Sequence, residues 1–525
     1  MKYFNTTGPC DPDMHYMLPA AERLPDACRH IARGQYFVLH APRQTGKTTS
    51  LAELARRLTD EGRYLALHFS CEVAASFGDD FAGAERAILD RIQRAARVAR
   101  VAPELMPPLP WPESAPGTML GNGLADWVEQ CPRPLVLFFD EIDALRGMGL
   151  INVLRQLRDG YTTNRRGFVH SIVLCGLRDV RDYKAAAGGD PVRLGSSSPF
   201  NIKVESIRLG DFTRAEVVAL YAQHTAATGQ EFTPRALDLA FYYTQGQPWL
   251  VNALAAEVVD GMRVETTITD DHIDQAKERL IVARATHLDS LVDKLTQPRV
   301  RQVIEPLLAG RDVDGDIEFT DALSYVRDLG LIARDRPVRV ANPIYNEVIV
   351  RVLGSGIEEN ITAEPYRFRL EDGRLDFPRL LDEFISFWKL HGEILASKQS
   401  YREVAPQLVL MAFLHRIVNG GGYIDREYGV GRGRIDLLVR QPYTGADGHR
   451  AEQREALELK VRRDGRADPL DEGLVQLDGC LDRMGLSTGV LVIFDCRAEA
   501  EPITQRTRFS TTTSPAGRRI TLLRA

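Results

Sequence analysis

The stretch VLHAPRQTGKTTSLAEL, from Val38 to Leu54, decides the fold of the first part of the chain. A short apolar run at 36–40 is typical of a buried strand, and after a glycine-bearing loop the chain takes up an amphipathic pattern with the period of a helix. The helical pattern ends at Gly62, since glycine commonly follows the last turn of a helix. A strand, a glycine loop and a helix N-terminus in this order favour binding of an anion such as phosphate.

The loop reads APRQTGKT over 41–48 and follows the phosphate-binding loop (P-loop) pattern at every position except the first. Ala41 stands where glycine is usual, but this small residue only has to make the turn out of the strand. Gly46 is present where the backbone comes closest to phosphate. We expect Lys47 to reach the β- and γ-phosphates of ATP and the Thr48 hydroxyl to bind Mg²⁺. The predicted nucleotide-binding residues of the loop are Ala41, Pro42, Arg43, Gln44, Thr45, Gly46, Lys47, Thr48 and Thr49.

A second apolar strand, at 134–139, ends in Asp140 and Glu141. Ligands of open α/β sheets bind at the carboxyl ends of the strands, so both acids are placed to face the nucleotide. Asp140 is expected to hold Mg²⁺, and Glu141 to position the attacking water as a general base. Two acids can also simply end a strand or cap the next helix, but the P-loop earlier in the chain disfavours that interpretation.

The whole chain predicts an α/β protein with four parts and a linker. Residues 1–210 alternate apolar strands with helices, which indicates a P-loop core with a parallel sheet covered on both faces. Residues 211–290 are helical and form the predicted lid, in which threonines precede the helices as caps. Helices and a short hairpin-like ending at 291–353 suggest a winged-helix-like domain. The stretch 354–378 lacks periodicity and is interpreted as a linker, and 379–525 begins a new α/β pattern.

Two further features connect the first part of the chain to a family. The segment TQGQPWLVNALA contains Gly246 and Pro248 at a helical break, and Arg178 ends the strand SIVLCGL. With the P-loop and FFDEID, they make residues 15–350 similar to the STAND-type and archaeal-type AAA-like ATPases, which carry a helical lid with a GxP motif and a winged helix. The resemblance implies that Pro248 lies near the adenine and Arg178 near the γ-phosphate. A solvated surface arginine is the alternative for Arg178.

The C-terminal part carries a second set of polar residues. Asp436 lies in the strand-like GRGRIDLLV, and Glu458 and Lys460 lie in ALELKV, where residues two apart project from the same face. Two carboxylates can hold one or two Mg²⁺ or Mn²⁺ ions that activate water, and a lysine can stabilise the charge of a phosphodiester under attack. The alternative is an exposed, salt-bridged hairpin. The flanking apolar residues disfavour it, because a carboxylate in such a surface is costly unless it is paired or bound to metal.

These residues resemble the PD-(D/E)XK nuclease superfamily, here spelled RID…ELK, over about 380–496. The resemblance implies a core of helix, three strands, helix and strand, as in restriction endonucleases. It also implies that an acid on the first helix and a glutamine on the later helix join the site. Glu403 and Gln476 match those two positions.

Charge and composition limit the partners. The net charge is −6, and the arginines near the second site are interspersed with acids, so we expect local phosphate contacts with DNA, or alternatively RNA, without sequence specificity. Seven scattered cysteines indicate a reducing compartment, and no apolar run is long enough to cross a bilayer. These features predict a cytoplasmic protein, and the P-loop predicts that it binds ATP and ADP. They leave a homo-oligomer or a protein partner open.

The sequence therefore predicts an ATP-binding and ATP-hydrolysing regulator coupled to a magnesium-dependent nuclease. By resemblance, families of this layout imply a role in prokaryotic defence or mobile-element biology. One alternative is a signalling or scaffold ATPase whose C-terminal domain binds nucleic acid or a partner without cleavage. Another is a switch that binds ATP tightly and turns over rarely, which the presence of Glu141 disfavours.

Overall fold

The structure is a computed structural model, and it divides the chain into two compact units. The described residues are 2–177, 205–283, 286–308, 320–358, 364–398, 405–418, 422–430, 433–445 and 448–525. The N-terminal unit comprises Met1–Phe241, Gln245–Ala276 and Asp328–Gly330. The C-terminal unit comprises Tyr242–Thr244, Lys277–Arg327 and Leu331–Ala525.

The N-terminal unit is built on a five-stranded sheet with the order β2-β3-β4-β1-β5. Its strands are β1 (Phe37–His40), β2 (Leu65–Ser70), β3 (Leu135–Asp140), β4 (Ser171–Gly176) and β5 (Ser206–Arg208). All neighbouring strands run parallel, and every residue of β3 and β4 is buried. This sheet confirms the predicted parallel α/β core.

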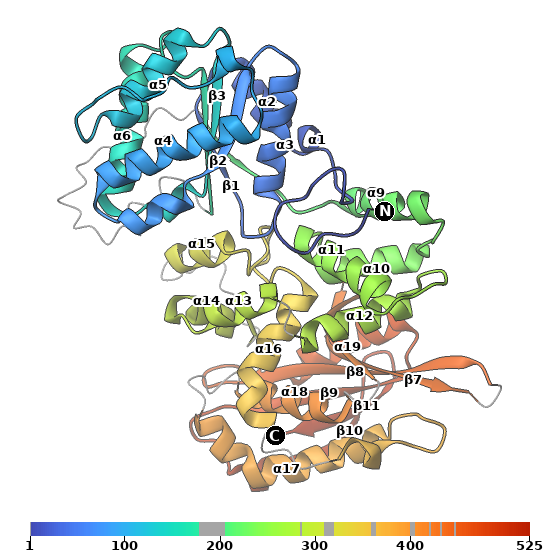
Figure 1. Cartoon of the computed structure of the whole chain (residues 1–525). Helices are drawn as coiled ribbons and strands as arrows, with labels where there is room; N and C mark the ends of the chain where they lie inside the picture. The colour runs from blue at the N-terminus through green and yellow to red at the C-terminus, as the bar shows by residue number, and fades with distance from the viewer. Residues whose placement is uncertain are drawn as a thin grey trace. The chain divides into compact units, whose positions relative to one another are not determined.

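Helices cover both faces of this sheet (Figure 1). Apolar residues of α2 (Pro25–Ala32) and α3 (Lys47–Asp60) pack on one face with the side chains of Phe37, Leu39 and others. The other face is covered by α4 (Phe81–Val98), α5 (Met119–Gln130) and α6 (Gly147–Thr163). The short helix α1 (Ala20–Arg23) precedes α2.

Four helices, α9 (Arg214–Thr228), α10 (Pro234–Thr244), α11 (Pro248–Ala256) and α12 (Asp270–Val282), occupy the predicted lid region. Two predicted threonine caps are confirmed, because the side chains of Thr213 and Thr233 accept backbone hydrogen bonds at the starts of α9 and α10. Between α10 and α11, Gly246 has a φ of 77°, and a Cβ there would lie 1.8 Å from the Phe212 carbonyl oxygen. This position therefore requires glycine.

The C-terminal unit begins with helices. They are α13 (Thr286–Leu295), α14 (Pro298–Leu308), α15 (Thr320–Asp328) and α16 (Pro343–Glu358). An antiparallel bridge joins Ile332 to Val340 where the sequence indicated a hairpin; the winged-helix assignment stays a prediction. Helix α16 and the short η7 (Pro365–Phe368) extend regular structure into the range predicted as a linker.

A six-stranded mixed sheet with the order β10-β11-β9-β8-β7-β6 forms the rest of this unit. The strands β6, β7 and β8 are antiparallel neighbours, whereas β8, β9 and β11 run parallel. Their bounds are β6 (Tyr423–Val430), β7 (Gly433–Thr444), β8 (Arg450–Arg462), β9 (Thr488–Asp495), β10 (Arg508–Thr513) and β11 (Arg519–Arg524). The second sheet is therefore mixed, in contrast to the first.

Three helices accompany this sheet: α17 (Phe377–Lys398), α18 (Ala405–Val418) and α19 (Leu470–Met484). Apolar side chains of α19 pack with those of β7, β8, β9 and β11 in one buried core. From α18 to β9 the elements follow in the order helix, three strands, helix, strand. Strands β10 and β11 and the short α20 (Ile503–Arg506) lie beyond the predicted elements. No helix in the described ranges has the length and apolar character needed to cross a bilayer.

Candidate functional site

The P-loop connects β1 to α3 and encloses the ammonium group of Lys47. Lys47 Nζ donates hydrogen bonds to the carbonyl oxygens of Ala41, at 2.9 Å, and Pro42, at 2.7 Å. Gly46 has a φ of 85° at the N-cap of α3, a conformation that favours glycine. Burial lowers the pKa of Lys47. An ammonium held in a concave loop at a helix N-terminus can bind a phosphate group.

Ala41 fits the loop without strain. Its side chain is fully buried, and its N–H donates to the Gly176 carbonyl at 3.3 Å. Ala41 does not occur among the described residues with positive φ. The turn out of β1 therefore does not need the conformational freedom of glycine.

Asp140 lies at the end of β3 beside the first turn of α3. Its Oδ2 accepts a hydrogen bond from Thr48 Oγ1 at 2.7 Å, and His68 Nε2 lies 3.0 Å from the same oxygen. Burial acts to raise the pKa of Asp140, but the contacts with His68 and Thr48 outweigh it and lower that pKa. The carboxylate thus stays ionised beside the Thr48 hydroxyl, and this pair fits the Mg²⁺ ligand set that the sequence predicted.

Glu141 follows directly and projects to an exposed position. Ser70 Oγ, at the end of β2, donates to Glu141 Oε2 at 2.5 Å. Glu141 has a φ of 55°, which turns the chain out of the strand. Ser70 therefore orients the side chain that the sequence indicated as the general base.

The sequence interpretation missed His68 and Ser70. Both lie near the carboxyl end of β2, two residues apart, in the otherwise apolar LALHFS. Polar side chains on alternate residues at the carboxyl end of a buried parallel strand indicate a position beside the ligand. Here β2 pairs with β3 through Phe69 and Ser70, so its end lies next to Asp140.

A cavity of about 260 Å³ opens beside the P-loop. It is lined by Asn5, Thr6, Gly8, Pro9, Cys10, Tyr16, Met17, Leu18, Arg23, Gln44, Gly46, Lys47, Thr48, Thr49, Ser50, Phe212, Leu220, Pro248, Trp249 and Asn252. Its walls therefore come from the loop, from the lid helices and from an N-terminal segment, 5–18, that the sequence interpretation did not assign to the site.

Specific hydrogen bonds hold the N-terminal segment in place. The Cys10 N–H donates to Thr49 Oγ1 at 3.0 Å, and Trp249 Nε1 donates to the Thr6 carbonyl at 2.8 Å. The amide of Gln223 bonds both the N–H and the carbonyl of Met17. The segment is thus tied to α3, α9 and α11. These contacts are far apart in sequence, so periodicity gives no signal for them.

Arg23 is a second cation on the cavity wall that was missed. Its guanidinium donates to the Gly210 carbonyl at 2.6 Å and lies over the Phe212 ring, 4.6 Å from its centroid. Burial lowers the pKa of Arg23, although Glu216, 3.6 Å away, opposes this. With Lys47, it gives the cavity two half-buried positive charges.

The start of α11 also belongs to this cavity. Gln247 caps the helix by accepting from the Leu250 N–H at 2.6 Å, and its Nε2 donates to the Gln44 carbonyl of the P-loop at 3.4 Å. Pro248, predicted near the adenine, lines the cavity. Arg178, predicted near the γ-phosphate, lies outside the described residues.

The second candidate site lies on β7, β8 and α19. The Leu459 N–H donates to Asp436 Oδ2 at 2.7 Å, which holds the first acid against β8. Lys460 Nζ lies 3.0 Å from Glu458 Oε1 and donates to Gln476 Oε1 on α19. The structure therefore brings four of the five predicted residues together. The fifth, Glu403, lies outside the described residues.

Glu458 is 2% exposed, and its Oε2 has no hydrogen-bond partner in the described part of the chain. Burial and the neighbouring Asp436 raise the pKa of Glu458 to about 8, although Lys460 opposes this. Burial acts to lower the pKa of Lys460, but Glu458 and Asp436 outweigh it and raise that pKa. A buried, unpartnered carboxylate oxygen beside a second carboxylate fits a bound divalent cation. No group of three or more histidine, cysteine, aspartate and glutamate side chains able to hold a metal occurs among the described residues.

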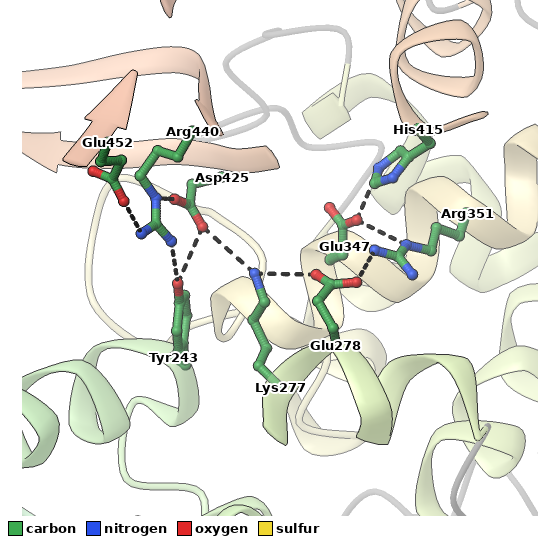
Figure 2. Close-up of polar contacts among 9 residues, drawn as sticks. All are labelled: Tyr243, Lys277, Glu278, Glu347, Arg351, His415, Asp425, Arg440 and Glu452. Atoms are coloured by element: carbon green, nitrogen blue, oxygen red, sulfur yellow. Dashed lines mark hydrogen bonds and ion pairs between the residues drawn. The ribbon is translucent and has the colours of Figure 1, made fainter. Parts of the chain in front are cut away.

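A buried network of charges lies elsewhere in the C-terminal unit (Figure 2). Asp425 on β6 accepts from Arg440 on β7 at 2.6 Å and from Tyr243 Oη at 3.2 Å, and lies 3.5 Å from Lys277 Nζ. Arg440 Nη2 also donates to Tyr243 Oη at 3.0 Å. Burial acts to raise the pKa of Asp425, but Arg440 and Lys277 outweigh it and lower that pKa. Tyr243 and Lys277, which belong to the C-terminal unit, are thus joined to two strands of its mixed sheet.

The same network continues into α16 and α18. Lys277 lies 3.3 Å from Glu278 Oε1, and Arg351 bridges Glu278 to Glu347, at 2.7 and 2.8 Å. His415 Nε2 lies 2.8 Å from Glu347 Oε1. Acids and bases alternate along the chain of contacts, so each buried charge has an opposite neighbour.

Residues 31–183 match the family model described as an AAA domain. This segment contains the P-loop, Asp140 and Glu141. It is an AAA-type P-loop ATPase domain, which implies ATP as ligand and usually Mg²⁺. A search of curated proteins finds no match to the chain.

Several solved structures are similar to this chain in backbone fold, but their sequence identity to it is low. A Walker-type ATPase of Pyrococcus abyssi is 12% identical, with 66% of this chain and 99% of that chain covered and a TM-score of 0.47. The ORC1 protein of Aeropyrum pernix, solved in complex with DNA, is 13% identical, covering 64% and 93%, with a TM-score of 0.34. The RuvB Holliday junction branch migration motor of Thermotoga maritima is 15% identical, covering 63% and 93%, with a TM-score of 0.33. At such TM-scores these likenesses carry no conclusion about function.

Proposed function

We propose that the chain is an ATP-controlled, magnesium-dependent nuclease that cleaves phosphodiester bonds in DNA or RNA. The observation that carries the proposal is the second candidate site, where Asp436, Glu458 and Lys460 converge and Glu458 keeps a buried, unpartnered oxygen. The proposal also includes membership of the PD-(D/E)XK superfamily and a role in prokaryotic defence or mobile-element biology. Only the sequence resemblance supports these two points.

Each residue of this site has a chemical task in the proposed reaction. Asp436 and Glu458 would hold Mg²⁺ or Mn²⁺, which when bound polarises the phosphate and lowers the pKa of water. The Lys460 ammonium would stabilise negative charge that develops on the phosphate oxygens. Gln476 accepts from Lys460 and would orient its ammonium toward the substrate.

The ATPase site would act as the control input. Lys47 and Arg23 would stabilise the phosphate charge, Thr48 and Asp140 would hold Mg²⁺, and Glu141, oriented by Ser70, would position the attacking water. Pro248 would contact the adenine. By the same resemblance, Arg178 would lie near the γ-phosphate.

The buried network gives a physical route for coupling. Tyr243 and Lys277 belong to lid helices, and Pro248, which lines the nucleotide cavity, follows Tyr243 by five residues along the chain. Both side chains bond Asp425, which in turn bonds Arg440, four residues after Asp436 on β7. A nucleotide-dependent movement of the lid helices would therefore act on the strand that carries Asp436.

We expect Lys460→Ala to lower the cleavage rate by about 100-fold or more, because an electrostatic stabiliser of the transition state is removed. The measurement is cleavage of plasmid, linear and single-stranded DNA and of RNA with Mg²⁺ or Mn²⁺, in the presence of ATP, ADP or a non-hydrolysable analogue. Glu472→Gln is the matched control: Glu472 lies 3.6 Å from Lys460 but is exposed, so this variant should cleave like the wild type.

If wild type and Lys460→Ala are equally inert on every substrate, the nuclease proposal fails. Binding of nucleic acid by both, without cleavage, would then favour the scaffold ATPase. The paired Asp436 and Glu458 disfavour that second candidate, since a binding surface gains nothing from a buried carboxylate beside another.

Tyr243→Phe tests the coupling. The variant keeps the ring and removes the hydroxyl that contacts both Asp425 and Arg440. In Tyr243→Phe, the effect of ATP on the cleavage rate, measured as the ratio of the rates with and without ATP, should become about fivefold smaller. The affinity for ATP should stay near that of the wild type. Tyr221→Phe is the control, because it removes a buried hydroxyl bonded to the Val251 carbonyl within the lid. An unchanged ratio in Tyr243→Phe, or equal changes in both variants, would contradict the relay.

A further inference from the structure

The outward side of helix α4 carries a row of arginines. On the opposite side of the helix, apolar residues such as Ile88 and Ile92 pack into the buried core on the sheet. Arg86, Arg94 and Arg97 are exposed, and their spacing along the helix places them together on the side away from that core. We call these three residues the arginine stripe.

The guanidinium groups of the stripe are not used within the protein. None of the three has an ion pair or a side-chain hydrogen bond in the described part of the chain. Asp90 is exposed and lies one helical turn from both Arg86 and Arg94, but the structure pairs it with neither. On α3, by contrast, Arg57 pairs with Glu61 at 2.8 Å. The stripe is therefore available to a partner.

The charge around the stripe is positive. The segment 81–100 contains five arginines and two acids. One of these acids, Glu85, is buried and accepts hydrogen bonds from the N–H groups of Gly117 and Met119, each at 2.8 Å. Asp90 is thus the one exposed acid of this segment, in a chain whose net charge is −6. A locally positive surface on an acidic protein fits a polyanion.

The shape of the surface indicates which polyanion it fits. The stripe extends over about 16 Å of the helix axis, and each strand of a nucleic-acid duplex presents one phosphate per roughly 3.4 Å. Sites for single strands combine positive charge with aromatic side chains on which bases stack. The segment 82–100 contains no aromatic residue. Charge without a stacking surface favours a duplex, in which the bases are already stacked and covered.

We infer that the outward side of α4 binds the phosphate backbone of a nucleic-acid duplex, independently of base sequence. The arginine stripe would donate hydrogen bonds to phosphate oxygens, a geometry that suits the guanidinium group. This surface belongs to the N-terminal unit and adds a binding site to the proposed function. It does not depend on that function, because binding requires neither cleavage nor ATP hydrolysis.

The test measures binding of the full chain to a DNA duplex, an RNA duplex, a single DNA strand and vesicles containing phosphatidylserine, without divalent metal so that nothing is cleaved. Arg94→Ala/Arg97→Ala should weaken duplex binding at least about tenfold near about 0.1 M salt and lower the slope of log affinity against log salt by about two. Asp90→Asn should tighten duplex binding about threefold, because it removes the exposed acid of this surface.

Arg29→Ala/Arg56→Ala is the matched control, since it changes the net charge by the same amount. Both arginines are exposed on helices that cover the other face of the sheet, and each is paired with an acid of its own helix, at 2.9 and 3.9 Å. This variant should bind duplexes within about twofold of the wild type. Because every substituted residue is exposed, all variants should melt near the wild-type temperature.

Three results would overturn the inference: equal weakening by the two double variants, tighter binding of wild type to the single strand than to either duplex, and binding to vesicles without binding to a duplex. Absence of all binding by wild type would overturn it as well. If the stripe binds a duplex but the chain never cleaves one with Mg²⁺ or Mn²⁺, the surface stands and the nuclease proposal fails. Cleavage by a chain whose duplex binding ignores the stripe would overturn the surface alone.

Discussion

Lys47→Ala is expected to weaken ATP binding by at least about 100-fold, because the triphosphate loses a half-buried, charge-assisted hydrogen-bond donor. In the structure the ammonium lies inside the loop and bonds only carbonyl oxygens of Ala41 and Pro42 among the contacts described. A phosphate would exchange those neutral partners for a charged one. Titration calorimetry with ATP and Mg²⁺ measures the loss directly.

Ala41→Gly is the matched control for this result, since it changes the same loop without removing a charge. Ala41 is buried, has no positive φ and donates its N–H to Gly176. Glycine adds freedom that the turn does not use, so ATP affinity should stay within about twofold of the wild type. A large gain of affinity in Ala41→Gly, or wild-type affinity in Lys47→Ala, would show that the loop is misinterpreted.

Local sequence patterns predicted those parts of the fold in which the interacting residues are close together or regularly spaced in the sequence. The strand, loop and helix around Lys47 and the apolar strand before Asp140 follow from periodicity and from the rule that ligands bind at strand ends. Glu458 and Lys460 lie on one strand with the spacing of a single face, so their proximity was also predictable.

Contacts between distant segments could not be predicted in this way. Cys10 meets Thr49, and Trp249 meets Thr6, through hydrogen bonds that depend on tertiary packing alone. The charge network is similar: Lys277 and Asp425 are ordinary surface residue types until the fold buries both.

Glu458→Gln should abolish both cleavage and the stabilisation of the protein by divalent metal. Its carboxyl has a pKa of about 8 in the folded chain against an ordinary value of 4.5. The fold therefore favours the neutral form, and this contribution to stability is fully present below pH 4.5 and is lost as the pH rises through about 8. Glutamine is neutral at every pH, so the metal-free variant should melt at a higher temperature than the wild type above about pH 8.

Metal binding should show the opposite pH dependence in the wild type, because a cation needs the ionised carboxylate. Its apparent affinity for Mn²⁺ should rise about tenfold per pH unit up to roughly pH 8 and then level off. The measurement is thermal unfolding between about pH 6 and 9, with and without Mn²⁺, alongside the cleavage assay. Glu458→Gln should show no Mn²⁺ shift at any pH.

Glu455→Gln separates the loss of a buried acid from the loss of a metal ligand. Glu455 lies on the same strand, three residues earlier, and burial raises its pKa as well, although Gln453 opposes this. Its substitution should alter the pH dependence of melting in the same direction but keep the Mn²⁺ shift and the cleavage. If Glu458→Gln retains the Mn²⁺ shift, or Glu455→Gln loses it, the metal is held elsewhere, and Asp436 and Glu458 are only neighbouring acids in the sheet.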